Sequence, residues 1–130
     1  MNKDHAKHNE NACKYLYQSG IYYDWVVTTA FYSAMHYVHH DLFPMEFYDE
    51  SYENFNVYYG SRYNHLIDRP SKHQATIDLI NNRLPNCKRY YRWLYDECYT
   101  ARYNKYNVSI EMAKKAMDFL TYIKAHLNKI

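Results

Sequence analysis

Four residues that can bind metal ions or carry protons lie close together in the sequence, at His36, His39, His40 and Asp41. His36 and His40 are four residues apart, so on a helix they share a face and could hold a metal ion between them. A catalytic zinc site needs a third ligand and usually a general base, and no H-E-x-x-H arrangement occurs in the chain. We therefore expect no metal site. We interpret His36 as half-buried and bonded to a backbone or tyrosine partner, and His39 and His40 as stabilising the carboxyl end of a helix.

Basic and aromatic residues alternate along residues 88–106. Such interleaving suits single-stranded RNA, because arginine binds phosphate while aromatic rings stack on bases. The residues we expect to bind a ligand are Arg89, Arg92, Trp93, Arg102 and Tyr103. Amphipathic packing is the alternative, since 18 tyrosines spread over the chain place aromatic residues beside basic ones by chance. The formal net charge of +2 is too small to decide between the two.

The composition argues against several other kinds of site and location. Two glycines cannot build the glycine-rich loops that bind nucleotides, and we expect no cofactor. Cys13, Cys87 and Cys98 are odd in number and lack C-x-x-C spacing, which favours buried free thiols. The polar amino terminus has no apolar signal-peptide core, and no apolar stretch approaches the roughly 20 residues of a membrane span. We therefore expect a cytoplasmic chain without a membrane partner.

The scarcity of turn residues predicts an all-α fold, because two glycines and three prolines leave long uninterrupted elements. The predicted helices cover residues 5–19, 21–43, 72–84, 87–106 and 110–130. Short connections make neighbouring helices antiparallel, so we expect residues 1–130 to form one domain, an up-and-down bundle of about five helices. Residues 45–69 show no clear period; this segment can hold a short helix and is a candidate functional loop.

Local signals support these helices. A stripe of small side chains predicts that the helix over residues 21–43 is central, since a neighbouring helix can approach it closely. The stripe consists of Thr29, Ala30, Ser33 and Ala34. Ser71 with Gln74 predicts a capping box at the start of the third helix, and Ser109 predicts an N-cap for the last helix. The face that we expect the last helix to bury contains Ile110, Ala113, Met117, Leu120 and Leu127.

Three stretches of the sequence resemble HEPN domains. Residues 30–37, Ala-Phe-Tyr-Ser-Ala-Met-His-Tyr, place an aromatic and small-residue run before a histidine. Residues 19–23, Ser-Gly-Ile-Tyr-Tyr, resemble the family's short turn after a helix, and Arg102-Tyr103 before Ser109 resembles its Arg-Tyr turn into the last helix. HEPN domains are α-helical bundles that commonly dimerise. Many are ribonucleases of toxin–antitoxin, abortive-infection or CRISPR systems, and others are inactive companions of nucleotidyltransferases.

The ribonuclease members of that family carry an arginine, then four to six residues, then a histidine, which two protomers bring to the scissile phosphate. In this chain Arg62 precedes His65 too closely, and Arg69 likewise precedes His73 too closely. Arg102 has no histidine at the required spacing. The resemblance therefore implies a non-catalytic, HEPN-like homodimer that binds RNA or a protein partner such as a nucleotidyltransferase, in a defence or toxin–antitoxin context.

Two alternatives remain open. Cleavage of RNA at the ribose 2′-OH needs a proton carrier near neutral pH and a cation for the phosphate. A divergent, metal-independent endoribonuclease is therefore possible, with candidate catalytic residues Arg102, Arg62, His65 and His73. The other alternative is a purely structural bundle that self-associates through its tyrosine-rich surface.

Overall fold

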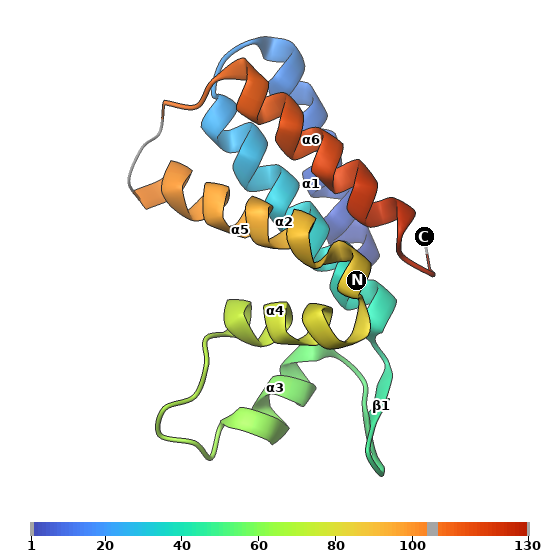
Figure 1. The fold of residues 1–130 in the computed structure, drawn as a ribbon. Helices are drawn as coiled ribbons and strands as arrows, with labels where there is room; N and C mark the ends of the chain where they lie inside the picture. The colour runs from blue at the N-terminus through green and yellow to red at the C-terminus, as the bar shows by residue number, and fades with distance from the viewer. Residues whose placement is uncertain (1, 104–106, 130) are drawn as a thin grey trace.

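A computed structural model of the chain describes residues 2–103 and 107–129. These residues form helices and one small antiparallel hairpin (Figure 1). The elements are α1 (Asn2–Ser19), α2 (Tyr23–Leu42), β1 (Met45–Phe47), β2 (Glu50–Tyr52), α3 (Phe55–Tyr63), α4 (Lys72–Arg83), the 3-10 turn η1 (Pro85–Cys87), α5 (Lys88–Tyr103) and α6 (Ile110–Ala125). The mainly helical prediction is confirmed. None of the described helices combines the length and apolar character that a membrane span requires.

The helices divide into a bundle and a smaller group at one end of it. In Figure 1, α1, α2, α5 and α6 pack together in the upper half, while α3, α4 and the hairpin lie below. The prediction of a single bundle of about five helices stays untested in its details. The helix predicted over residues 72–84 is present as α4, but it covers the end of the bundle.

Close contact between α1 and α2 depends on small side chains. Ala30, Ser33 and Ala34 of α2 are completely buried. Ser33 Oγ donates a hydrogen bond to the backbone carbonyl of Ala6 in α1 at 2.8 Å, which requires the two helix backbones to lie close together. Thr29, by contrast, is half-buried and bonds within its own helix to the carbonyl of Trp25. The prediction of a central helix with a small-residue face is confirmed.

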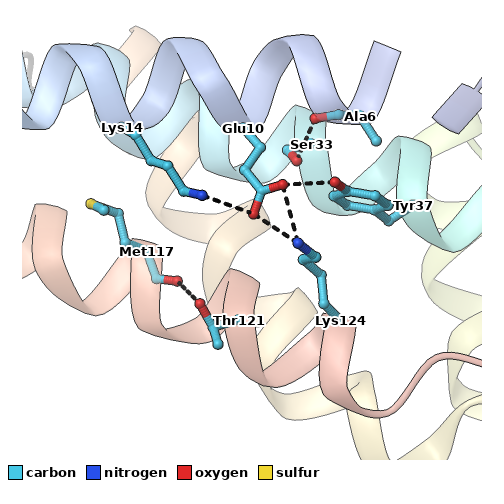
Figure 2. A network of polar contacts seen from close by, with 8 residues as sticks. All are labelled: Ala6, Glu10, Lys14, Ser33, Tyr37, Met117, Thr121 and Lys124. Carbon is cyan, nitrogen blue, oxygen red and sulfur yellow. Dashed lines mark hydrogen bonds and ion pairs between the residues drawn. The ribbon is translucent and has the colours of Figure 1, made fainter. Parts of the chain in front are cut away.

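A polar junction joins α1, α2 and α6 (Figure 2). Glu10 of α1 accepts hydrogen bonds from Tyr37 Oη at 2.7 Å and from Lys124 Nζ at 2.9 Å. Burial raises the pKa of Glu10, but the hydrogen bonds from Tyr37 and Lys124 outweigh it and leave the pKa below its ordinary value. The carboxylate therefore stays charged near neutral pH and holds the three helices together.

Helix α4 belongs to two hydrophobic clusters at once. Ile77 and Ile80 pack into the main core of the bundle. Ala75 and Leu79 pack into a second cluster, which α4 shares with the hairpin and α3. The other buried members of this second cluster are Phe43, Met45, Tyr52, Phe55, Tyr58 and Tyr59. The segment 45–69 is thus anchored through α4.

The hairpin within residues 45–69 differs from the sequence prediction, which contains no strand. Each strand is three residues long, with Met45 opposite Tyr52 and Phe47 opposite Glu50. So short a strand offers almost no alternation of polar and apolar residues from which it could be recognised. The short helix allowed for in this segment is present as α3.

Both predicted serine N-caps are confirmed. Ser71 Oγ accepts a hydrogen bond from the backbone N–H of Gln74 at 3.0 Å, and Ser109 Oγ accepts one from that of Met112 at 3.2 Å. The side chain of Gln74 donates to Asp78 at 3.0 Å, so it is engaged along α4 and not with the backbone of Ser71. Because the cap at Ser71 begins the helix that carries His73, it also fixes the position of this imidazole along the chain.

The last two helices differ from the predicted ones at their ends. Helix α5 begins at Lys88, after the 3-10 turn, and the predicted extension to residue 106 lies outside the described residues. Helix α6 ends at Ala125 instead of continuing along the chain. Ile110 is 47% exposed, so its predicted burial is wrong. The buried face of α6 consists of Ala113, Ala116, Leu120 and Ile123.

Replacing Ser33 by leucine should destabilise the protein, because the larger side chain cannot fit against the backbone of α1. We expect the free energy of unfolding to fall by about 1–3 kcal/mol, the usual cost of overpacking a core. The control Ser33→Ala only removes the hydrogen bond to Ala6 and should cost about 0.5–1.5 kcal/mol. Urea denaturation followed by circular dichroism measures both, and an unchanged midpoint for Ser33→Leu would contradict the close contact of α1 with α2.

Candidate functional site

Side chains from distant parts of the sequence meet at a cavity where α2, α4 and α5 converge. His73 lies in the first turn of α4, and Arg102 lies in the last turn of α5. Both line a cavity of about 170 Å³, which we call the arginine cavity. Arg102 Nη1 donates a hydrogen bond to Tyr32 Oη of α2 at 3.0 Å. The other lining residues are Phe31, Tyr32, Ser71, Tyr95, Cys98, Tyr99 and Tyr103. The structure thus brings together two of the catalytic candidates expected from the sequence.

His73 is held among aromatic rings on one wall of the arginine cavity. Its ring centroid lies 5.5 Å from those of Phe31 and Tyr95 and 6.3 Å from that of Tyr32. Partial burial lowers the pKa of His73, and the positive charge of Arg102 lowers it further. The imidazole is therefore neutral near pH 7, with one nitrogen able to accept a proton.

Arg102 is exposed and lies beside two exposed tyrosines. Its guanidinium carbon is 5.5 Å from the ring centroid of Tyr103, and the rings of Tyr99 and Tyr103 are 5.0 Å apart. These tyrosines are 52% and 65% exposed, respectively. Among residues 2–103 and 107–129, none that lines the arginine cavity is acidic. A cation beside free aromatic faces, with no carboxylate on the cavity wall, favours an anion that carries an aromatic group.

A larger cavity of about 330 Å³ shares His73 with the arginine cavity, and we call it the histidine cavity. His36 Nδ1 is 3.1 Å from Asn2 Oδ1, and His39 Nε2 is 3.0 Å from Thr76 Oγ1. Burial lowers the pKa of His39 to about 3, with smaller contributions from His36 and His73, so this ring is neutral. The other lining residues are Met35, Asn54, Phe55, Asn56 and Lys72.

The histidines of α2 therefore have different partners from those expected. The half-buried position of His36 is confirmed, but its partner is the amide of Asn2. His39 is 6% exposed, bonds to Thr76 of α4 and stacks on Phe55 at 4.3 Å, so its expected role at the helix end is wrong. His40 is half-buried. Within residues 2–103 and 107–129, no three His, Cys, Asp or Glu residues are grouped so that they could hold a metal ion.

Arg62 and His65, the other pair of catalytic candidates, lie at a separate cavity beside the hairpin. The guanidinium carbon of Arg62 is 4.5 Å from the ring centroid of Phe47, so the side chain covers an aromatic ring of β1. Asp49 and Glu50 line the same cavity. Their carboxylates disfavour a bound phosphate, and this cavity does not include His73 or Arg102.

The predicted binding residues are divided between two sides of α5. Trp93 packs edge-to-face on Phe119 of α6 at 5.0 Å, with Lys115 Nζ 4.9 Å from its ring centroid. Ordinary packing between α5 and α6 therefore accounts for this tryptophan. Arg92 forms an exposed ion pair with Asp96 at 3.2 Å. The guanidinium of Arg89 donates to Tyr90 Oη at 3.1 Å, whereas Arg102 and Tyr103 line the arginine cavity.

Two site residues were not identified from the sequence. Tyr32 precedes His36 by four residues, so helical periodicity places the two on one face of α2 and could have linked them. Tyr95 precedes Arg102 by seven residues, about two helical turns, and shares its side of α5. Tyr32 lies within the stretch 30–37 that resembles HEPN domains, but that resemblance does not single it out as a site residue. What brings both tyrosines to His73 is the packing of α4 against α2 and α5.

Stability should fall on acidification, in part because of His39. An unfolded histidine binds a proton below about pH 6.5, whereas folded His39 does so only near pH 3. Below pH 6.5 the unfolded state therefore binds more protons, and stability falls by up to about 1.4 kcal/mol per pH unit for this one group. Urea denaturation between about pH 7 and pH 5 should show a shallower decline for His39→Gln than for the wild type. The exposed His8→Gln should keep the wild-type decline, and equal slopes for all three proteins would contradict the neutral state of His39.

Comparison of the chain with protein-family models, with curated proteins and with solved structures found no match. The resemblance to HEPN domains therefore stays a prediction. The case for a function depends on the geometry of the arginine cavity, where an exposed guanidinium, a neutral imidazole and two free tyrosine rings lie around one small space.

Proposed function

We propose that the chain is a binding module for single-stranded RNA and that the arginine cavity is its phosphate site. The observation that carries this proposal is that Arg102 and His73 line one cavity without an acidic residue. Arginine binds phosphate with several N–H donors in a planar fork, and its charge does not depend on pH in the physiological range. A phosphate held there would lie beside the exposed rings of Tyr99 and Tyr103.

The rings of Tyr99 and Tyr103 offer stacking surfaces for the bases of a single RNA strand. Bases of single-stranded nucleic acid stack on exposed aromatic faces, and each stacked base contributes about 1–3 kcal/mol in other proteins. Tyr99 and Tyr103 are one helical turn apart at the end of α5, with ring centroids 5.0 Å apart. This spacing favours contact with bases on either side of the bound phosphate, without discrimination between RNA sequences.

The wider setting of the proposal follows the resemblance. The chain is a HEPN-like homodimer acting in the cytoplasm, in a defence or toxin–antitoxin context. Support for the location comes from Cys13, Cys87 and Cys98, which are buried free thiols of the kind a reducing compartment preserves. Support for self-association comes from Tyr22 and Trp25, which are 62% and 50% exposed at one end of α2. Sedimentation equilibrium that returns only the 15.9 kDa mass of one chain would contradict the dimer.

Removal of the Arg102 guanidinium should weaken RNA binding selectively. For Arg102→Ala we expect the dissociation constant for a labelled single-stranded RNA to rise at least about fivefold, because one charge-assisted hydrogen-bonding partner of the phosphate is removed. The slope of log K against log salt should shrink by about 0.7 for each phosphate that the variant no longer neutralises. Fluorescence anisotropy at several salt concentrations measures both quantities.

The matched control is Arg92→Ala, which removes the same charge from an exposed position on α5. It should change affinity little, because Arg92 is paired with Asp96 and is not a lining residue of the arginine cavity. Equal losses in the two variants would show that only net charge matters. Absence of RNA binding by the wild type would overturn the proposal and direct attention to a protein partner such as a nucleotidyltransferase.

A metal-independent endoribonuclease is a second candidate, favoured by the neutral state of His73 beside Arg102. His73 would accept the proton of a ribose 2′-OH, whose oxygen attacks the adjacent phosphorus. Arg102 would stabilise the charge that develops on the phosphoryl oxygens. The bond to the 5′-oxygen breaks, this oxygen takes a proton from water, and the products are a 2′,3′-cyclic phosphate and a 5′-hydroxyl.

For this candidate, wild-type protein should cleave single-stranded RNA in the presence of EDTA. His73→Ala should slow cleavage by about 10²–10⁴-fold, the usual contribution of a general base, while His65→Ala should cleave at the wild-type rate because His65 lies at the hairpin cavity. Gel electrophoresis resolves the fragments, and phosphatase resistance identifies the cyclic end. Intact RNA after incubation with the wild type rules the ribonuclease out and leaves the binding module.

A further inference from the structure

The histidine cavity adjoins the arginine cavity and is built for a different part of a ligand. His73 lines both cavities, so a ligand that contacts it from one side can extend into the other. The volume of about 330 Å³ lies at the lower end of the roughly 300–1,000 Å³ of small-molecule sites. Most of the residues that line it carry polar side chains, and Met35 and Phe55 add apolar surface.

The hydrogen-bonding groups on these walls are fixed by their neighbours. Thr76 Oγ1 donates its only hydrogen to the carbonyl of Lys72 at 3.0 Å, so it must accept from His39 Nε2. The neutral ring of His39 therefore carries its proton on Nε2, which leaves Nδ1 as an acceptor. Partial burial lowers the pKa of His36, and the nearby His5 lowers it further, so this ring is also neutral near pH 7. His36 Nδ1 donates to the amide oxygen of Asn2 at 3.1 Å, because that oxygen can only accept, and His36 Nε2 is therefore an acceptor.

The opposite wall offers donors. The side-chain oxygen of Asn54 caps α3 by accepting from the backbone N–H of Val57 at 2.9 Å, which leaves its NH₂ group to donate. Lys72 Nζ donates to Asn56 Oδ1 at 3.3 Å, which leaves the NH₂ group of Asn56 and the other hydrogens of Lys72 to donate to a ligand. Phe55 also lines the cavity, and it is 5% exposed and stacks on the ring of His39 at 4.3 Å.

We propose that the histidine cavity receives one nucleobase of the RNA, namely the base of the nucleotide whose phosphate contacts Arg102 and His73. The inference rests on the proposed RNA-binding function and adds base selectivity to it. A flat heteroaromatic ring with both donors and acceptors on its edge matches a cavity that has acceptors from α2, donors from the start of α3 and α4, and the apolar side chains of Met35 and Phe55. A base with the wrong edge would leave the hydrogen-bonding groups of the cavity, among them the half-buried His36, without partners, which disfavours its binding.

Ribose 5-phosphate and the four ribonucleoside 5′-monophosphates test this directly, because ribose 5-phosphate is the same ligand without a base. The ring C–H signals of the histidines, assigned by substitution, report contact by NMR, and titration gives the dissociation constants. We expect one nucleotide to bind at least about fivefold more tightly than ribose 5-phosphate, the equivalent of one stacked base. That nucleotide should shift the signals of both His36 and His73.

Asn56→Ala and His36→Gln should each reduce the advantage of the preferred nucleotide over ribose 5-phosphate to less than about twofold. The matched control is Asn11→Ala, at an exposed position of α1 that does not line the histidine cavity, which should keep the full advantage. If ribose 5-phosphate shifts His73 but no nucleotide binds more tightly, the base pocket is overturned while the phosphate site stands. If no probe shifts His73, and RNA affinity is unaffected by Arg102→Ala, the RNA-binding function fails and this inference fails with it.

Discussion

The burial of α2 is the constraint on which the rest of the structure depends. This helix approaches α1 closely at Ala30, Ser33 and Ala34, and the hydrogen bond from Ser33 to the backbone of α1 opposes a shift along the helix. The opposite side of α2 carries the large rings of Phe31 and Tyr32. Because one side is fixed by close contact, the other presents Tyr32 and His39 at defined positions toward α5 and α4, where they bond to Arg102 and Thr76.

Helix α4 completes the site by contributing His73, and a buried hydrogen bond joins this helix to α2. The hydrogen bond between His39 and Thr76 lies inside the protein, where it requires a neutral imidazole. Around it, the stacked rings of His39 and Phe55 tie the hairpin side to the bundle. The same docking places His73 next to Phe31, so the contacts that stabilise α4 also position the imidazole that faces both cavities.

The sequence predicts the features that depend on neighbouring residues within one helix. It does not predict those that depend on how one helix packs against another. Ser71 and Ser109 are found because a cap involves residues three apart. The buried face of α6 is only partly predicted. Ile110, in the first turn, is exposed, whereas Ala113 is buried. His73 and Arg102 appear separately among the candidates, but they lie 29 positions apart in the sequence. Their meeting requires α4 to lie across the end of the bundle, which no local pattern encodes.

The double membership of α4 makes the two clusters one cooperative unit. Ala75 and Leu79 cannot leave the hairpin cluster without tilting the helix that buries Ile77 and Ile80 in the bundle. Local unfolding of β1 and β2 therefore requires part of the free energy of global unfolding. A surface loop that frays by itself would require much less. It also moves the first turn of α4, and with it His73. A ligand that binds His73 would in turn raise the free energy needed to open the hairpin. Occupancy of the site and local opening of β1 and β2 are therefore thermodynamically linked.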